Sequence, residues 1–126
     1  MKHDPHWLER EDIGAVTVVR VKTHQITDEE TIRTVFDLIY KLITDVGRNQ
    51  MILNLDAADF LPSMGLGKLV MLNRKIQAAK GRLALCHLAP LVQESLEHTR
   101  LVPLFNIYTT EAEAVASFGS AEKTVD

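Results

Sequence analysis

The stretch that decides the fold covers residues 51–69 and reads MILNLDAADFLPSMGLGKL. Its first five residues form a short, mostly apolar run, which is typical of a central strand covered on both faces. The Asp-Ala-Ala-Asp run that follows favours a turn. Pro62 holds Leu61 extended, and Ser63 stands where a helix has to begin. The stretch therefore predicts a strand, a turn and a helix in that order.

The same alternation continues on both sides of this stretch. Two runs separated by Gly14, the second rich in β-branched residues, predict an N-terminal hairpin. The expected strands are residues 7–13, 15–21, 51–55, 83–88 and 105–108. The expected helices lie between residues 27 and 47 and at residues 63–80, 91–99 and 111–118. Because strands and helices alternate, we expect an α/β fold, a mixed sheet of four to five strands with about four helices packed on it.

The ends of these helices carry residue signals of their own. Thr27 is expected as the N-cap of the first helix, with Glu30 as its capping-box partner. Gly47 is expected just past the end of that helix, and Gly81 is expected to stop the second helix. Thr110 is expected to cap the last helix.

Length and composition set further bounds. The chain has 126 residues, 46% of them hydrophobic, which predicts one domain over residues 1–126 with an ordered core at about 7–118. A net charge of −3 disfavours nucleic acid and anionic membranes as partners. One cysteine excludes an internal disulfide framework and a zinc site built on cysteines. No apolar run approaches the ~20 residues that span a bilayer, and no secretory signal opens the chain, so a cytoplasmic location is expected.

Residues 63–67, Ser-Met-Gly-Leu-Gly, are the most informative candidate site. In one interpretation Ser63 only caps the helix, while Gly65 and Gly67 admit close packing on the sheet. In the other, a phosphoryl group on Ser63 would meet the unpaired N–H groups and the positive dipole of the helix start. The two glycines each cost about 1 kcal/mol of helix propensity, which suggests a close approach to the backbone there. Spacing alone favours the capping interpretation, and the segment matches neither a P-loop nor a dinucleotide fingerprint.

Other residues with chemical potential have plainer structural explanations. Cys86 lies within a strand pattern and is expected to be a buried core thiol. Asp56 and Asp59 could pair as catalytic carboxylates, but turn residues that bond their own backbone are the usual explanation. No nucleophile, base and oxyanion donors can be assembled, so we expect no enzyme activity, catalytic residue or cofactor. No metal site is expected either, because the histidines lack ligand spacing: His3, His6, His24, His87 and His98.

Several ordered motifs give this chain a resemblance to a known family. Residues 51–69 resemble the signature of STAS domains of anti-sigma factor antagonists, in which a Val-Leu-Asp-Leu strand precedes Phe-Ile-Asp-Ser-Ser-Gly-Leu-Gly. Residues 80–88, KGRLALCHL, are similar to the Gly-Gly-x-Leu-x-Leu strand of the family. Residues 101–108, LVPLFNIY, are similar to its Leu-x-x-Leu-Phe-x-Ile-Tyr segment, and residues 111–114 to its closing helix. The likeness covers about residues 10–118 and implies a STAS-like α/β domain.

The resemblance also implies a function by partner switching in transcription regulation. In that family an anti-sigma factor that is also a kinase phosphorylates a serine at the start of the second helix, and a serine phosphatase reverses the modification. The unmodified antagonist binds the anti-sigma factor and frees the sigma factor. The phosphoacceptor serine falls on Ser63. The implied partner-binding residues are Pro62, Ser63, Met64, Gly65, Leu66, Thr23 and His24.

The chain departs from the family pattern at three places. Pro62 replaces the acidic residue before the serine, and Asn54 replaces the aspartate of the preceding strand. The usual Gly-x-Leu-Asp after the second strand is absent, and residues 23–28, THQITD, stand there instead.

Two other functions therefore stay open on the sequence. One is a STAS scaffold subunit of a larger regulatory or transport complex that is not phosphorylated. The other is weak nucleotide binding or hydrolysis at the Ser63 helix start, although the P-loop lysine and the hydroxyl that would hold Mg²⁺ are missing.

Overall fold

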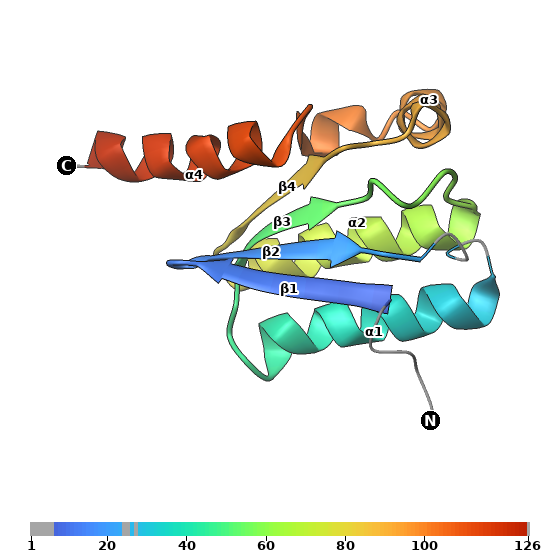
Figure 1. Ribbon diagram of the computed structural model, residues 1–126, viewed down its shortest axis with the longest axis horizontal. Helices are drawn as coiled ribbons and strands as arrows, with labels where there is room; N and C mark the ends of the chain where they lie inside the picture. Colours follow the sequence, from blue (N-terminus) through green and yellow to red (C-terminus); the bar gives the residue numbers. More distant parts are fainter. Residues whose placement is uncertain (1–6, 24–25, 27, 126) are drawn as a thin grey trace.

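The computed structural model describes residues 7–23, 26 and 28–125, with side chains as far as Gly119. The strands are β1 (Leu8–Ile13), β2 (Val16–Val21), β3 (Gln50–Asn54), β4 (Arg82–Cys86) and β5 (Asn106–Tyr108). The helices are α1 (Glu29–Thr44), α2 (Ser63–Ala78), α3 (Pro90–His98) and α4 (Glu111–Val125), and the 3-10 turn η2 (Val102–Leu104) precedes β5 (Figure 1). The alternation expected from the sequence is confirmed.

The strands form one five-stranded sheet in the order β1-β2-β3-β4-β5. β1 pairs antiparallel with β2 as the expected hairpin, and the other pairs are parallel, so the mixed sheet is confirmed. Parallel strands end at the same edge of a sheet. The segments that follow β2, β3 and β4 therefore meet at one end of the molecule, on the right in Figure 1.

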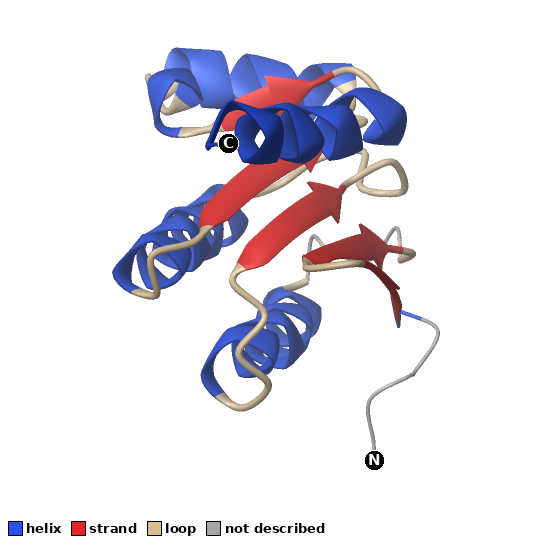
Figure 2. Ribbon diagram, turned by 90° about the vertical axis from the view of Figure 1, so that its left-hand side faces the viewer, coloured by secondary structure: helices blue, strands red, loops and turns tan. Residues whose placement is uncertain are grey.

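Alternate residues of the central strands pack on opposite faces of the sheet. Helices α1 and α2 cover one face and α4 covers the other (Figure 2). The first face carries the larger core, to which α3 also contributes through Val92 and Leu96; its strand residues include Val19, Met51, Leu53, Leu83 and Leu85. The second core packs beneath α4 and comprises Val16, Val18, Ile52, Ala84, Cys86, Ala114 and Phe118.

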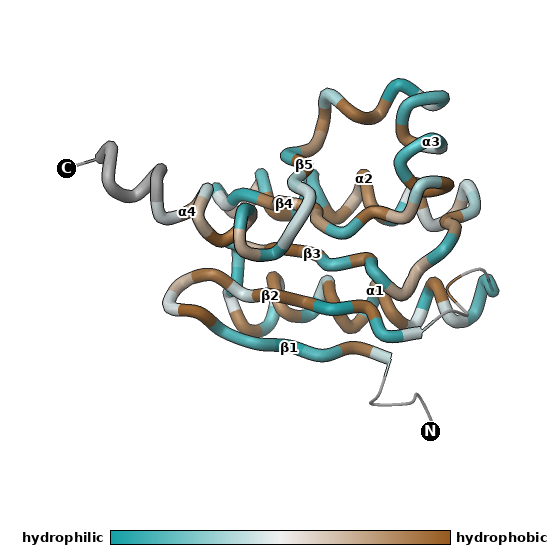
Figure 3. Tube along the Cα trace, turned by 45° about the horizontal axis from the view of Figure 1, so that its top comes forward, coloured by the Kyte–Doolittle hydropathy of each residue, from teal (hydrophilic) through white to brown (hydrophobic). Residues whose placement is uncertain are grey.

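Strand β1 forms one edge of the sheet and differs in character from the strands beside it. Figure 3 shows it as mostly hydrophilic, whereas the middle of β3 is hydrophobic. Its exposed run is Glu9-Arg10-Glu11-Asp12, in which Arg10 and Asp12 pair at 3.0 Å. Charged side chains on an edge strand oppose pairing with another chain. We therefore do not regard β1 as a binding edge.

The start of α1 differs from the expected one. Asp28 is the N-cap, and its carboxylate accepts hydrogen bonds from the N–H and the hydroxyl of Thr31, both at 3.1 Å. The expected N-cap, Thr27, lies outside the described residues. Because Asp28 takes the cap position, the expected capping box of Thr27 and Glu30 is wrong. Asp28 caps well because its charge also faces the positive end of the helix dipole.

The end of α2 shows that Gly81 has a different role from the expected stop signal. The helix ends at Ala78, and Lys80, not the glycine, takes the left-handed conformation with φ of 62°. A Cβ on Gly81 would lie 1.8 Å from the carbonyl oxygen of Asn49. That carbonyl accepts the Arg82 N–H at 2.9 Å, just where β4 begins. Gly81 is thus required because two backbone segments cross with no room for a side chain.

Within the described residues, no helix combines the length and the apolar character needed to cross a membrane.

Candidate functional site at the start of helix α2

Ser63 is the first residue of α2 and is exposed to solvent. The N-cap is Pro62, with φ of −71° and ψ of 174°, and among the described residues this helix start has no side-chain cap hydrogen bond. The interpretation of Ser63 as an N-cap is therefore wrong by one position. The proline ring fixes Pro62 in the extended cap conformation and moves the serine into the first turn.

The first turn of α2 has backbone N–H groups that take no part in helical hydrogen bonds. The first helical hydrogen bond runs from the N–H of Leu66 to the carbonyl of Pro62 at 3.0 Å, so the N–H groups of Ser63, Met64 and Gly65 precede it. No acidic residue stands in this turn to balance the positive end of the helix dipole. A negative group placed on the Ser63 oxygen would meet favourable electrostatics.

Buried side chains fix the loop before Ser63 to the hydrophobic core. The side chains of Leu55, Ala58 and Leu61 are fully or almost fully buried. Backbone hydrogen bonds run from Leu55 N to the Cys86 carbonyl at 3.2 Å and from Ala58 N to the Leu55 carbonyl at 2.9 Å. Because core residues hold this loop, the exposed serine is presented from a fixed support.

The two glycines of the first turns have different surroundings. A Cβ on Gly65 would come within 2.9 Å of the Leu61 side chain, so this glycine permits the helix to pack on its own loop. Gly67 is exposed, and a Cβ there would meet nothing within 4 Å. Gly67 is therefore not needed for internal packing, and it leaves the helix backbone open to an approaching molecule.

The implied partner-binding residues are not equally accessible. Ser63 is exposed, and Pro62 and Met64 are partly exposed, whereas Gly65 and Leu66 are buried. Thr23 is only 7% exposed, and His24 lies outside the described residues.

Sequence reasoning missed one exposed neighbour of Ser63. Phe60 is 41% exposed on the same loop, and an aromatic residue between turn residues was the signal that could have found it.

The start of α1 lies beside the start of α2. A cavity of about 280 Å³ is lined by Glu29 and Ile32 of α1, by the N-cap Pro62 and by Met64 of α2. Pro62 and Met64 directly precede and follow Ser63 in the sequence, so the cavity lies next to the serine. The first turns of α1 and α2 therefore form one continuous surface around this cavity.

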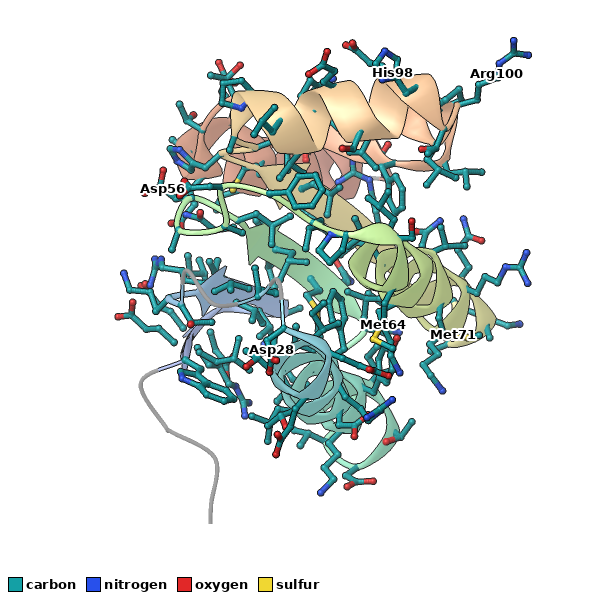
Figure 4. All side chains as sticks on the ribbon, turned by 90° about the vertical axis from the view of Figure 1, so that its right-hand side faces the viewer. Asp28, Asp56, Met64, Met71, His98 and Arg100 are labelled. Carbon is teal, nitrogen blue, oxygen red and sulfur yellow. The ribbon has the colours of Figure 1, made fainter. Side chains whose placement is uncertain are left out.

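The end of the molecule around Ser63 is acidic. Figure 4 views this end and shows Asp28 and Asp56 on it. Exposed carboxylates lie at the start of α1 and in the loop before α2. The described residues between 54 and 67 include no lysine or arginine. The exposed acidic residues are Asp28, Glu29, Glu30, Asp56 and Asp59. A phosphate on Ser63 would add to an existing negative surface.

A larger cavity of about 540 Å³ lies beyond the ends of β4 and β5. Its polar lining side chains include those of Asp56, His87, Gln93, Tyr108 and Thr109. The described lining residues of the two cavities include no lysine or arginine, and each lining includes a carboxylate. These linings do not favour a nucleoside triphosphate, whose phosphates require cationic or N–H donors.

Asn54 at the end of β3 belongs to a partly buried polar network. Its amide donates to Glu111 at 2.7 Å, and its side-chain oxygen accepts the Asp56 N–H at 2.8 Å. Glu111 also accepts two hydrogen bonds from the Arg20 guanidinium, at 2.6 and 2.9 Å. The hydrogen bonds from Arg20 lower the pKa of Glu111 below its usual value. Their effect is larger than that of burial, which raises the pKa. An amide fits between these groups, whereas the aspartate of the family pattern would face Glu111 as a second carboxylate.

Replacing Asn54 with aspartate should therefore destabilise the fold by about 2 kcal/mol at pH 7, because a hydrogen bond to a charged group becomes a repulsion. Repulsion raises the pKa of one carboxyl in the folded state above its unfolded value. The folded variant then binds protons more readily than the unfolded variant. The difference in unfolding free energy between the variant and the wild type should therefore become smaller as the pH falls from 7 towards 4. Urea unfolding at both pH values measures this. The double variant Asn54→Asp with Glu111→Gln should recover part of the loss; equal losses at both pH values would contradict the network.

Cys86 is a buried core residue, as expected from the sequence. Burial raises the pKa of its thiol to about 12, so it stays protonated and is a poor nucleophile. His87 and His98 are described by the structure, whereas His3, His6 and His24 lie outside the described residues. No cluster of three or more metal-ligating side chains occurs within the part of the chain that the structure describes.

The fold is a five-stranded mixed sheet with four helices, and an exposed serine is the first residue of the second helix. The chain belongs to the STAS domain family, whose model matches residues 8–114.

Known proteins support this placement. BtrV of Bordetella bronchiseptica, provisionally named an anti-sigma factor antagonist, is 29% identical over 77 residues, which cover 61% of this chain. The matched stretch spans 66% of BtrV, just under two thirds of its length.

Solved structures show the same fold. A Thermotoga maritima protein, provisionally assigned as an anti-sigma factor antagonist, has a TM-score of 0.79 at 21% identity, covering 89% of this chain and 94% of its own. The anti-sigma factor antagonist SpoIIAA in its unphosphorylated form has a TM-score of 0.75 at 22% identity, covering 90% and 96%. SpoIIAA of Bacillus in its phosphorylated form has a TM-score of 0.68 at 21% identity, covering 88% and 98%.

Proposed function

We propose that this chain is an anti-sigma factor antagonist that binds an anti-sigma factor with serine kinase activity and is switched by phosphorylation of Ser63. The observation that carries the proposal is that Ser63 is exposed, that its hydroxyl does not cap the helix, and that the loop before it is fixed to the core. The provisional name of BtrV and the two solved forms of SpoIIAA, with and without phosphate, support it.

The switch has a simple physical basis in this geometry. Transfer of the terminal phosphoryl group of ATP to the Ser63 oxygen, with loss of the hydroxyl proton, adds about −1.5 to −2 charges. The open N–H groups of the first turn of α2 tolerate that charge, so the domain stays folded. A partner seated over Ser63 loses contacts to the phosphate, and its acidic groups are repelled by it. Each 1.4 kcal/mol lost weakens binding about tenfold. A serine phosphatase would restore the binding form.

Two of the three departures from the family pattern, at Asn54 and Pro62, are compatible with this proposal. Asn54 satisfies Glu111, which explains the missing aspartate by packing within this chain. Pro62 shifts the serine out of the cap position and leaves its hydroxyl unused.

Pro62 also favours a second candidate function, because the proline removes the acid that a kinase or phosphatase of the family would meet before the serine. In that case the chain is a STAS scaffold subunit of a larger complex, and its binding does not depend on Ser63. The two candidates differ in whether a negative charge at Ser63 changes binding.

Capture from the cell that makes the chain tests the proposal. The full chain and its Ser63→Asp variant are immobilised separately, and bound proteins are identified by mass spectrometry. We expect an anti-sigma factor with a kinase domain on the wild-type chain and a strong depletion of it on the variant. Recovery of a multi-subunit assembly on both, with no anti-sigma factor, would support the scaffold instead.

A further inference from the structure

A stripe of four residues runs down the α1 side of helix α2, starting next to Ser63. Its members, which we call the α2 stripe, are Met64, Lys68, Met71 and Lys75. At 3.6 residues per turn they lie within about 60° of one another around the helix axis. Met71 is 44% exposed, and the other three are partly exposed. Figure 4 shows Met64 and Met71 on the side of α2 that faces α1.

Tyr40 of α1 holds the two lysines of the stripe in place. Its hydroxyl donates to the Lys68 carbonyl at 2.8 Å. The ammonium groups of Lys68 and Lys75 lie 6.0 and 5.1 Å from the centre of its ring. Burial, with a smaller effect of Asp37, raises the pKa of Tyr40 to about 12, so the hydroxyl keeps its proton. Both positive charges therefore lie within cation–π distance of one aromatic ring.

The two lysines of the stripe differ from several arginines of the chain in their ion pairing. Among the described residues, neither lysine of the stripe makes an ion pair, whereas Arg10, Arg20, Arg33 and Arg48 all do. Helix α2 contains no aspartate or glutamate. In a chain of net charge −3, this stripe is a local positive surface with two exposed thioethers. Methionine side chains adapt to the shape of an apolar partner, which makes them common at binding surfaces.

We propose that the α2 stripe binds an acidic amphipathic helix of the anti-sigma factor partner. Met64 and Met71 are seven residues apart, and so are Lys68 and Lys75. A helix laid along the stripe meets this spacing with apolar residues over the methionines and carboxylates against the lysines. Met64 also lines the cavity beside Pro62, so the stripe is continuous with the proposed switch surface. A phosphate on Ser63 then acts at one end of a longer contact.

The inference rests on the proposed function, because it gives the chemistry of the partner that docks at Ser63. It is tested without Ser63 chemistry, so the two can fail separately. The full chain is labelled with ¹³C at the methionine methyl groups. It is titrated with a synthetic alanine-rich peptide of about 20 residues, long enough to be helical, that carries Leu pairs and Glu pairs at the same spacing. A second peptide with Lys in place of Glu is the control.

We expect the acidic peptide to shift the Met64 and Met71 methyl signals and to leave that of the buried Met51 unchanged. The double variant Lys68→Glu with Lys75→Glu should bind the acidic peptide at least about tenfold more weakly and should now bind the Lys peptide. Arg74→Glu makes the same charge change about 100° away from Lys75 on the helix and should alter affinity less than about twofold. An unchanged Met51 signal in each variant shows that the core is intact.

Three outcomes overturn the inference. One is the absence of shifts at Met64 and Met71 at about millimolar acidic peptide. Another is an equal response to both peptides. The third is a response of these methyls to duplex DNA, anionic vesicles or higher concentration of the chain itself, with none to the acidic peptide.

Discussion

Replacing Ser63 with aspartate should weaken binding of the anti-sigma factor at least about 100-fold, a change of about 2.7 kcal/mol in binding free energy. The new carboxylate enters an end of the molecule that already carries Asp28, Glu29 and Asp56. It also occupies the exposed position on which the partner is proposed to sit. Ser63→Ala removes only a hydroxyl with no bond at this helix start, so its affinity should stay within a few-fold of wild type. Isothermal titration calorimetry with the purified anti-sigma factor measures both.

The matched control for this variant is Gln77→Glu. It adds the same charge to an exposed residue of α2, at the opposite end of the helix from Ser63. Its affinity should fall less than about threefold, because surface charges that far apart are largely screened. If Ser63→Ala and Ser63→Asp bind the anti-sigma factor with equal affinity, the switch is contradicted and the scaffold function is favoured.

Replacing Gly81 with alanine should cost at least about 3 kcal/mol of unfolding free energy. The new Cβ would lie 1.8 Å from the Asn49 carbonyl oxygen, which is backbone and cannot rotate away. The same carbonyl accepts the Arg82 N–H, so relief of the clash would also disturb the first residue of β4. Overpacking of a rigid site commonly costs about 1–3 kcal/mol, and backbone atoms place this one at or above that range. Urea denaturation followed by circular dichroism gives the change.

Gly67→Ala is the control for that experiment. A Cβ at Gly67 meets nothing within 4 Å, and the residue lies inside a helix, so this variant should gain about 0.5–1 kcal/mol. The two substitutions are chemically identical and should act in opposite directions. If Gly81→Ala unfolds within about 1 kcal/mol of wild type, the close backbone crossing at Asn49 is wrong.

Much of the fold follows from local residue patterns. The β-branched run at residues 16–21 and the apolar run at 51–55 gave strands at β2 and β3, because short apolar segments between turn signals leave few alternatives. The helix start at Ser63 was located to within one residue by Pro62 and the turn before it. Thr110 was also correct, since its hydroxyl accepts the Glu113 N–H at 3.2 Å.

The features that escaped prediction depend on residues far apart in the chain. Asn54 looked like a lost carboxylate until Glu111, 57 residues away, was seen to need an amide donor. Gly81 looked like a helix stop, whereas its reason is the Asn49 carbonyl of a different loop. Tyr40 gave no signal in α1, because its role is set by Lys68 on the neighbouring helix. Local propensity carries no information on such contacts.

The central claim is tested most directly by locating the phosphate. The full chain is incubated with the captured anti-sigma factor and ATP, and tandem mass spectrometry assigns the modified residue while gel filtration follows the complex. The account predicts one phosphate, on Ser63, and loss of the complex in step with its appearance. A kinase that is active on another substrate but leaves Ser63 unmodified, or a Ser63-phosphorylated chain that stays bound, would contradict it.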